Sequence, residues 1–489
     1  MAITNPGGLL NSVPSVQQMT LQSNYIDFTA QATAGWAQQY LPELMEQEAE
    51  VFGNRTVSGF LSQVGAEMPM TSDQVVWSEQ GRLHLSYGGT TAAADVINIL
   101  TDADGNSVDA ANEAGHGIRI GDTVIVSSAA ETVRCYVTAA VSAGTGSSST
   151  THTITAKPYS HATLAAAGIG TGTVAVNVFV YGSEFLKGTD TNSTGANEPI
   201  FKSFTNKPII MKDKYHVSGS DTAQIGWVEV AGESGVGGYL WYLKAEGETR
   251  TRFTDYLEMT MIEAEKAVGS SGAEGALAAG AGTEGLLAAI SSRGNVETGG
   301  IVGTNTAAQN LATFDLILKE LDNQGAIEEN MLFLGRGHSL LIDDMLAGMN
   351  SYGTGGTSYG VFGNEEDMAI NLGFSGFRRA SYDFYKTDWK YLNDKGTRGG
   401  ILDANKLEGI LVPAGVTSVY DEVLGKNLKR PFLHVRYRAS QMDDRRLKTW
   451  TTGSVGGNIT SSIDKMEVHY LSERCLITQG ANNFMLLKS

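Results

Sequence analysis

The sequence predicts an α+β protein that carries a small all-β barrel as an insertion. Three observations predict this class. Helical periodicity is concentrated between residues 234 and 349, strand patterns gather on both sides of this centre, and residues 91–178 are short Val-, Ile- and Thr-rich runs separated by Gly-rich turns. Helices and strands that are segregated along the chain are typical of α+β folds. Closely spaced short strands are typical of small barrels.

Composition and charge exclude some classes of function. The chain has 489 residues, which at roughly 100–200 residues per domain gives room for several domains. Lys and Arg total 35 against 53 Asp and Glu, so the formal charge is −18. Binding to a nucleic-acid backbone needs clustered Lys and Arg, which excludes a general nucleic-acid binder but not a protein that lies beside nucleic acid. No segment reaches the ~18 apolar residues of a transmembrane helix, so we expect no membrane partner.

The first third of the chain is expected to form an arm and then an extended β element. Residues 1–63 are polar and include one expected helix at Pro42–Phe52. Residues 64–90 and 179–233 carry strand patterns on both sides of the barrel segment 91–178. We therefore predict that these two segments form the two sides of one extended element, with the barrel at its tip.

The first side of this element shows strand patterns directly. Val75–Trp77 is a short apolar run, and Leu83, Leu85 and Tyr87 alternate with polar residues. We expect strands over both stretches. Corresponding patterns on the return side cover Phe179–Leu186 and Pro208–Val217.

The clearest helix is expected at residues 239–268, within a segment 234–300 that precedes the centre of the chain. Its apolar residues are spaced 4, 4, 3 and 4 apart, which places them on one helix face: Phe253, Leu257, Met261, Ala264 and Val268. The following stretch, 269–305, is rich in Gly, Ala and Ser and is expected to be a mobile loop.

Residues 301–430 are expected to form a central α/β unit, and residues 431–489 a strand-rich end. Apolar spacing predicts two helices with a buried strand between them: Leu311, Phe314, Leu318 and Leu321, then Met331–Leu334, then Leu341, Met345 and Met349. A second Gly-rich loop is expected at 350–363. Further strands are expected at Gly409–Val412, Phe432–Arg438, Lys465–Tyr470 and Cys475–Thr478, and Phe484–Leu487 is expected to pair back into a sheet.

One enzyme-like pattern is the Gly335-x-Gly337 turn after the buried strand. A strand, a Gly-x-Gly turn and a helix can cradle a pyrophosphate on backbone N–H groups. Leu340 occupies the place of the third glycine of that motif, and no repeating βαβ pattern surrounds it. A plain strand-to-helix turn is therefore favoured over a nucleotide site.

Other patterns predict no catalytic, cofactor or metal site. Gly356-Thr357-Ser358-Tyr359-Gly360 lies in a flexible run rather than in the strand–turn–helix of a nucleophile elbow. The spacing of a calcium loop occurs without its Gly, so an acidic turn is favoured: Asp102, Asp104, Asn106, Val108 and Glu113. The histidines lack metal-ligand spacing, and Cys135 and Cys475 are expected to be inert buried thiols.

The densest group of mixed charges is expected either to be a solvated face or to be the rim of an interface between subunits. It contains Arg436, Arg438, Asp443, Asp444, Arg445, Arg446 and Lys448. Alternation places Arg436 and Arg438 on one face of a strand. With Trp77 and Arg82 of the extended element, the first six of these residues are our predicted assembly contacts.

The order of parts resembles a known family. The chain runs from an arm through a β excursion with a barrel, a long helix and a central α/β part. Its strand-rich end includes Glu473-Arg474-Cys475-Leu476-Ile477-Thr478-Gln479-Gly480-Ala481-Asn482-Asn483-Phe484. This is similar to the major capsid protein of tailed double-stranded DNA bacteriophages, the HK97-like fold. The likeness covers nearly the whole chain as architecture, and the barrel is an addition to the minimal fold.

The resemblance implies an architecture of an arm, an extended loop, a spine helix in a peripheral domain, an axial domain at 301–430, and last strands that return to the peripheral domain. It implies a structural protein, not an enzyme, that assembles into hexamers and pentamers of an icosahedral shell. The implied partners are the chain itself, portal, scaffold and decoration proteins, and enclosed double-stranded DNA without sequence-specific binding. The implied location is the virion, after assembly in the host cytoplasm.

Two alternatives to this function stay open. The first is a nucleotide-dependent enzyme that uses the Gly335-x-Gly337 turn, and the second is another virion or tail structural protein. No cofactor is expected for the structural function. The strongly helical centre disfavours the second alternative, because tail and adhesin proteins are mostly β or strongly repetitive.

Overall fold

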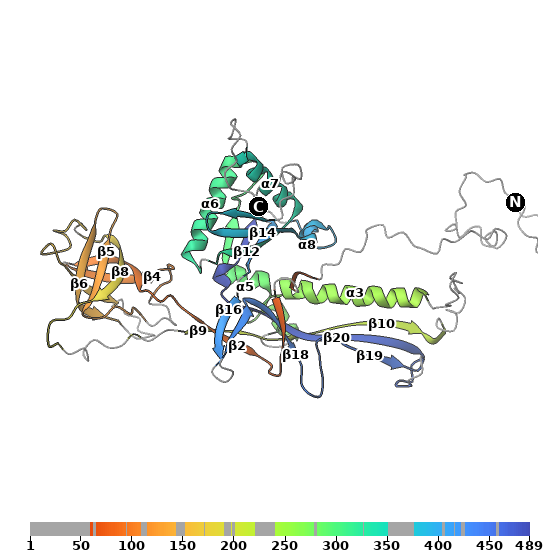
Figure 1. Ribbon diagram of the computed structural model, residues 1–489. Helices are drawn as coiled ribbons and strands as arrows, with labels where there is room; N and C mark the ends of the chain where they lie inside the picture. Colours follow the sequence, from red (N-terminus) through yellow and green to blue (C-terminus); the bar gives the residue numbers. More distant parts are fainter. Residues whose placement is uncertain are drawn as a thin grey trace, which may run out of the picture.

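The computed structural model has three parts that follow one another across the molecule: a β-barrel, a helix-covered sheet and a long sheet with a helix along it (Figure 1). It describes residues 59–61, 65–93, 95–108, 115–142, 152–170, 172–189, 197, 201–220, 240–277, 281–325, 327–350, 376–402, 406–414, 416–421, 426–455 and 459–489. The expected helix Pro42–Phe52, the second Gly-rich loop from residue 351 on and Ser358 lie outside these residues.

The long sheet is built around strand β20, Lys465–Thr478. Its order is β1-β18-β20-β10, with β19 also paired to β20. The other strands are β1 (Gly65–Met70), β10 (Ile209–Ser218), β18 (Leu433–Arg438) and β19 (Lys448–Gly453). We expected two strands, at Lys465–Tyr470 and Cys475–Thr478. That prediction was wrong, because the polar residues between them are buried and the pairing with β10 is continuous.

Helix α3, Leu240–Glu263, lies along this sheet and has 24 residues. Phe253 and Leu257 pack against Val468 and Tyr470 of β20, as the apolar spacing predicted. The helix ends five residues before the predicted end, and Val268 is 72% exposed. After Glu263 the chain turns to pair with a neighbouring segment, where Gly285 N–H donates to the Ala264 carbonyl.

The second sheet has the order β11-β21-β15-β12-β14-β13. Its strands are β11 (Asn295–Thr298), β12 (Glu329–Leu334), β13 (Gly376–Arg379), β14 (Tyr382–Asp388), β15 (Leu407–Pro413) and β21 (Met485–Lys488). Helices α6 (Ala307–Asn323) and α7 (Arg336–Asn350) share a buried apolar cluster with it. Both helices and the strand between them match the predicted spacing. The last strand, β21, lies in this sheet rather than with β20.

The stretch 269–305 is not the loop that we expected. It contains α4 (Gly272–Leu277), α5 (Leu286–Arg293) and β11. Leu286 and Ile290, four residues apart on α5, are fully buried. Their burial gives this segment the tertiary packing that its Gly- and Ala-rich composition does not predict.

A two-stranded ribbon leads from the long sheet to the barrel. It consists of β2 (Val75–Gln80) paired antiparallel with β9 (Phe201–Asn206). The two segments that flank the barrel therefore do pair, but Leu83 is 82% exposed and Arg82–Leu85 is not a strand. The β pattern there was misleading because these residues form the link between the ribbon and the barrel.

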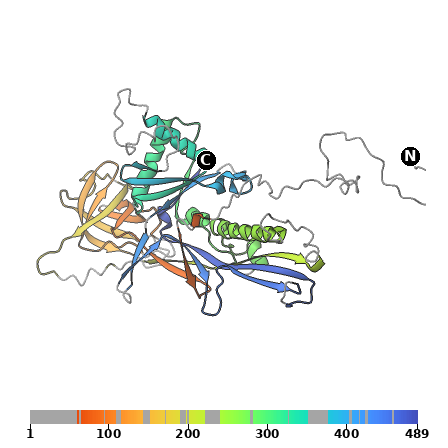
Figure 2. The ribbon, with the colours of Figure 1, turned by 45° about the vertical axis from the view of Figure 1, so that its right-hand side comes forward.

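The barrel is closed, with the order β3-β4-β7-β6-β5-β8. Its strands are β3 (Ser86–Ala93), β4 (Val96–Asp102), β5 (Asp122–Ser127), β6 (Thr132–Val141), β7 (Thr153–Pro158) and β8 (Ala175–Ser183). It has its own core, in which Ile97, Val124 and Val178 are fully buried. Figures 1 and 2 show it standing apart from the long sheet.

A shared core joins the two sheets. Phe333 of β12, Leu476 of β20 and Leu286 of α5 belong to one buried cluster. Short elements complete this region: α8 (Lys390–Asn393), the 3₁₀ turns Arg398–Gly400 and Ala481–Asn483, and the hairpin β16 (Val416–Asp421) with β17 (Lys426–Pro431). The two sheets therefore form one body, and the barrel is attached to it through the ribbon.

Candidate assembly contacts

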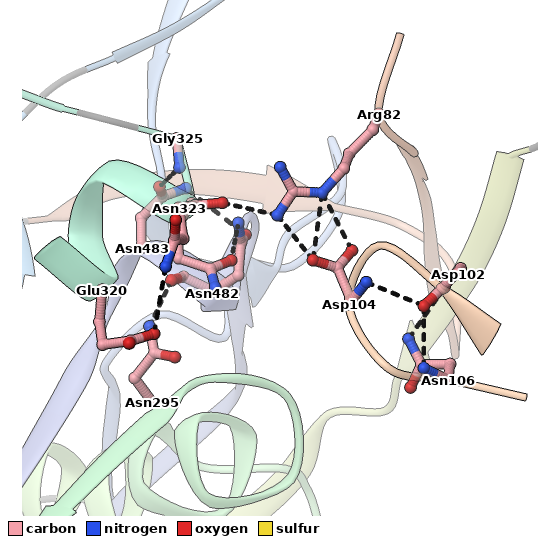
Figure 3. Close-up of polar contacts among 11 residues, drawn as sticks. Arg82, Asp102, Asp104, Asn106, Asn295, Glu320, Asn323, Gly325, Asn482 and Asn483 are labelled. Carbon is pink, nitrogen blue, oxygen red and sulfur yellow. Dashed lines mark hydrogen bonds and ion pairs between the residues drawn. The ribbon is translucent and has the colours of Figure 1, made fainter. Parts of the chain in front are cut away.

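Arg82 links the barrel to the body of the protein. Its guanidinium pairs with the Asp104 carboxylate in the barrel turn after β4, with Nη2 2.6 Å from Oδ1. The same Nη2 donates to the Asn323 carbonyl at the end of α6, also at 2.6 Å (Figure 3). A cation is favourable there, because the last carbonyls of a helix lack intrahelical partners and carry partial negative charge. We call this arrangement the Arg82 clasp.

The barrel side of the clasp is a rigid acidic turn. The Asp102 carboxylate accepts from the backbone N–H of Asp104 and of Asn106, at 2.9 and 2.8 Å. Asp104 is paired with Arg82, so the Asp102 and Asp104 carboxylates are both used in contacts within the chain. Within the described residues no group of three or more acidic, His or Cys side chains could hold a metal. The chain does turn here, with Gly105 N–H donating to the Asp102 carbonyl, and Glu113 lies outside the described residues.

The body side of the clasp is held by amide side chains (Figure 3). Asn483 accepts from the Gly325 N–H at 2.9 Å, just beyond α6. Asn295 donates to the Asn482 carbonyl at 2.7 Å, which ties β11 to the 3₁₀ turn before β21. The carbonyl that Arg82 reaches is therefore part of a fixed hydrogen-bonded frame.

Trp77 packs inside the chain and is 7% exposed. The Arg293 guanidinium carbon lies 5.6 Å from the centre of its ring, and Arg293 also pairs with Glu284. The indole N–H donates to Glu79, which accepts the Gly480 N–H as well. These contacts fix the ribbon to the body, and the predicted assembly contact at Trp77 stays a prediction.

The mixed-charge run forms a network of ion pairs around β20. Glu473 is 6% exposed at its side chain and is paired with Arg438 and Arg445, while Arg438 also pairs with Asp73. Arg446 pairs with Glu67 of β1 at 2.5 Å. These contacts join β1, β18, β20 and the loop after β18, so part of this run stabilises the subunit itself.

The remaining residues of the run lie nearer to solvent. The Asp444 carboxylate accepts the Arg446 N–H at 2.9 Å, and Lys448 pairs with Asp443 at 2.7 Å. Asp444 and Arg446 are exposed, and Met442 between them and β18 is 94% exposed. Arg436 lies opposite Cys475 in the pairing of β18 with β20. The loop 439–447 is the part of the run that can reach a neighbour.

The first described residues are fixed by a contact that sequence reasoning missed. Glu258 of α3 accepts the N–H groups of Gly59 and Leu61, at 2.7 and 2.9 Å. The Phe60 ring lies 4.6 Å from Phe333 and 4.8 Å from Trp389, centre to centre. Burial raises the pKa of the Glu258 carboxyl above its ordinary value. Glu258 lies off the apolar stripe of α3, so the apolar spacing carried no signal for this contact.

The Gly335-x-Gly337 turn leads from β12 into helix α7. The helix begins at Arg336, so Gly337 lies inside it. Two N–H groups at this turn have partners in the chain: Gly335 N–H donates to the Glu408 carbonyl and Arg336 N–H to the Asn393 side chain. Burial lowers the pKa of His338 to about 4, so this side chain is neutral at pH 7. The structure shows the strand-to-helix turn that the sequence favoured.

Both cysteines are buried and free. Burial raises the pKa of the Cys135 and Cys475 thiols to about 12 in each case. Thiolate is the reactive form, so these groups are inert in the folded chain. Among the described helices, none is long and apolar enough to cross a membrane.

Solved structures that resemble this chain are structures of phages and of a capsid. A structure of Gordonia phage Cozz has a TM-score of 0.40 and 11% sequence identity, and covers 96% of this chain and 98% of its own. One of Microbacterium phage Oxtober96 has a TM-score of 0.39 at 9% identity, over 93% and 97% of the two chains. The capsid of an empty GTA particle has a TM-score of 0.35 at 9% identity, over 94% and 99%.

No protein-family model and no curated protein matches the sequence. The structural scores are all below 0.5. At these scores the likeness fixes neither the family nor the function. The function is therefore proposed from the geometry of this chain.

Proposed function

We propose that the chain is the major capsid protein of a tailed double-stranded DNA bacteriophage, with an HK97-like fold. It would assemble into hexamers and pentamers of an icosahedral shell in the virion, after folding in the host cytoplasm. Portal, scaffold and decoration proteins would be further partners. The observation that carries the proposal is the combination of a long helix along an extended sheet, a second helix-covered sheet and a β ribbon that leads from the long sheet to the barrel.

The geometry suits a subunit whose function depends on large contact surfaces with its neighbours rather than on a binding pocket. Helix α3 lies on β10 and β20, and the opposite faces of these strands expose Lys212, Lys214 and His216. In the part of the chain that the structure describes, β2 and β9 pair only with each other and join no larger sheet. Repeated contacts of modest size add up in a closed shell, because each subunit is held by several neighbours.

The same arrangement of sheets, helices and ribbon supports an assignment of domains. The long sheet with α3 would be the peripheral domain, and the second sheet with α6 and α7 the axial domain. The ribbon would be the extended loop, and the barrel an inserted domain. The barrel has its own closed strand order and its own core, which supports the assignment as an insertion.

Electron microscopy of the purified chain, alone and co-expressed with the scaffold of its own virus, tests the proposal. We expect closed shells or rings of five or six subunits. A monomer or dimer that persists at high concentration in both preparations would contradict it.

A charge reversal at the loop 439–447 tests the proposed assembly contacts. Asp444→Arg should reduce shell yield and leave the subunit folded, because Asp444 is exposed. Asp344→Arg, at an exposed position on α7, is the matched control. Equal shell yields from both variants would contradict a role of the loop 439–447 in the interface.

A further inference from the structure

The barrel carries a shallow groove with a volume of about 800 Å³. This volume lies in the range of small-molecule sites, which is about 300–1,000 Å³. All of its lining residues belong to the barrel and the segments next to it, between Thr123 and Glu184. The barrel stands at the end of the ribbon, away from the long sheet (Figure 2). The groove is therefore built from the barrel and its adjoining segments alone.

Two exposed tyrosines line the groove. Tyr159, just after β7, is 53% exposed, and Tyr181 on β8 is 47% exposed. The barrel core is complete without these rings, since its interior is filled by residues such as Val124 and Val178. Folding therefore gives no reason for both tyrosine rings to remain in water.

The Tyr159 ring is held in place. Its hydroxyl donates to the Glu184 carboxylate at 2.5 Å, and its backbone N–H donates to the Arg134 carbonyl at 3.2 Å. Burial and the nearby carboxylate raise the pKa of this phenol, so it stays protonated and keeps donating. A ring that is fixed before a ligand arrives loses little entropy on binding.

The charged groups around the rings include one cation and two carboxylates: Arg134 stands against Glu131 and Glu184. A groove for phosphate or another polyanion needs an excess of cations, which is missing here. Ser160, Thr132 and these charged groups supply both donors and acceptors. The lining therefore suits a neutral ligand that has many hydroxyl groups.

We propose that this groove binds a neutral oligosaccharide. A pyranose ring has an apolar C–H face and a rim of hydroxyl groups. The C–H face would pack against the electron-rich faces of Tyr159 and Tyr181. The hydroxyl groups would bond to Arg134, Glu131 and Glu184. The site is independent of the proposed shell function, because it uses barrel residues alone.

Binding of a panel of neutral trisaccharides to the full chain tests this inference. Maltotriose, cellotriose, mannotriose and triacetylchitotriose are suitable probes, with saturation-transfer NMR at millimolar concentrations as the measurement. We expect at least one of them to bind. Tyr159→Ala and Tyr181→Ala should each weaken that binding about tenfold, the equivalent of about 1.4 kcal/mol for one aromatic contact.

Two further variants keep the result interpretable. Tyr385→Ala removes a tyrosine that is 50% exposed on β14, outside the barrel, and should leave binding unchanged. Tyr159→Phe keeps the ring and should retain most of the affinity. The inference is overturned if no probe binds, if both tyrosine-to-alanine variants bind like the wild type while folded, or if polyphosphate competes for the groove.

Discussion

Removal of the Arg82 side chain should loosen the barrel without unfolding it. Arg82 is the described side chain that contacts both Asp104 in the barrel and the Asn323 carbonyl in the body. The barrel and the body have separate cores, so Arg82→Ala leaves the apolar packing of both intact. The change should therefore act on the equilibrium between docked and undocked barrel.

The free-energy cost of Arg82→Ala can be worked out from the solvent exposure of the two paired side chains. The side chains of Arg82 and Asp104 are 42% and 45% exposed, so their ion pair is screened by water. An exposed pair contributes about 0.2–1 kcal/mol, and a cation at a helix C-terminus contributes about 0.3–1 kcal/mol more. We expect a loss of about 1 kcal/mol, which is about a fivefold shift toward undocked barrel.

Distances between spin labels measure this shift. Ala129→Cys on the barrel and Lys319→Cys on α6 provide exposed attachment sites. The native thiols do not compete, because both are buried. The distance distribution should be narrow in the otherwise wild-type chain and broader after Arg82→Ala.

The control is Arg378→Ala, which removes an arginine that is 64% exposed and pairs with Asp383 within the second sheet. It should not change the distribution. A distribution that stays equally narrow after Arg82→Ala would refute the clasp, since the ribbon alone would then fix the barrel.

Three further predictions concern buried groups. Asp343→Asn should cost about 3–5 kcal/mol in unfolding free energy, because Lys386, 6% exposed, would lose its ion-pair partner; chemical denaturation measures this. Cys135 and Cys475 should not react with a thiol reagent at pH 8 in the folded chain and should react in denaturant, because burial raises their pKa to about 12. Burial raises the pKa of Glu258 above 4.5, so the stability of the wild type relative to Glu258→Gln should fall as pH rises through that raised value.

Each of these has a control and a contradicting outcome. Asp383→Asn, whose partner is largely exposed, should cost less than about 1 kcal/mol, and an equal cost for Asp343→Asn would contradict the buried pair. Thiol labelling of the native chain would show that a cysteine is reached by local opening. Glu265→Gln, at an exposed position, should leave the pH profile of stability unchanged, and a profile that Glu258→Gln also leaves unchanged would contradict the burial of that carboxyl.

The sequence predicted elements well where apolar spacing alone decides them. Phe314, Leu318 and Leu321 are buried on α6, and Leu332 and Leu334 are buried on β12. In these elements the period of the apolar residues matches the face that is buried. The barrel was predictable for the same reason, since its strands alternate between core and solvent.

Prediction failed where polar residues are buried or where partners are far apart. Ser472, Glu473 and Arg474 interrupt an apolar pattern and suggested a break in β20, yet all three are buried. Arg438 and Arg445 neutralise Glu473, and a single sequence does not show which charges meet. The Arg82 clasp could not be predicted for the same reason, because Asn323 lies 241 positions from Arg82 in the sequence.

The ion pairs of the folded chain show how its arginines are used. A net charge of −18 by itself only argues against binding a polyanion. In the described residues, arginines on every part of the fold are already paired with carboxylates of the same chain: Arg82, Arg119, Arg252, Arg293, Arg336, Arg378, Arg379, Arg398, Arg438, Arg445, Arg446 and Arg474. Arginine is the side chain best suited to grip phosphate. A phosphate that bound one of these guanidinium groups would have to compete with its carboxylate partner.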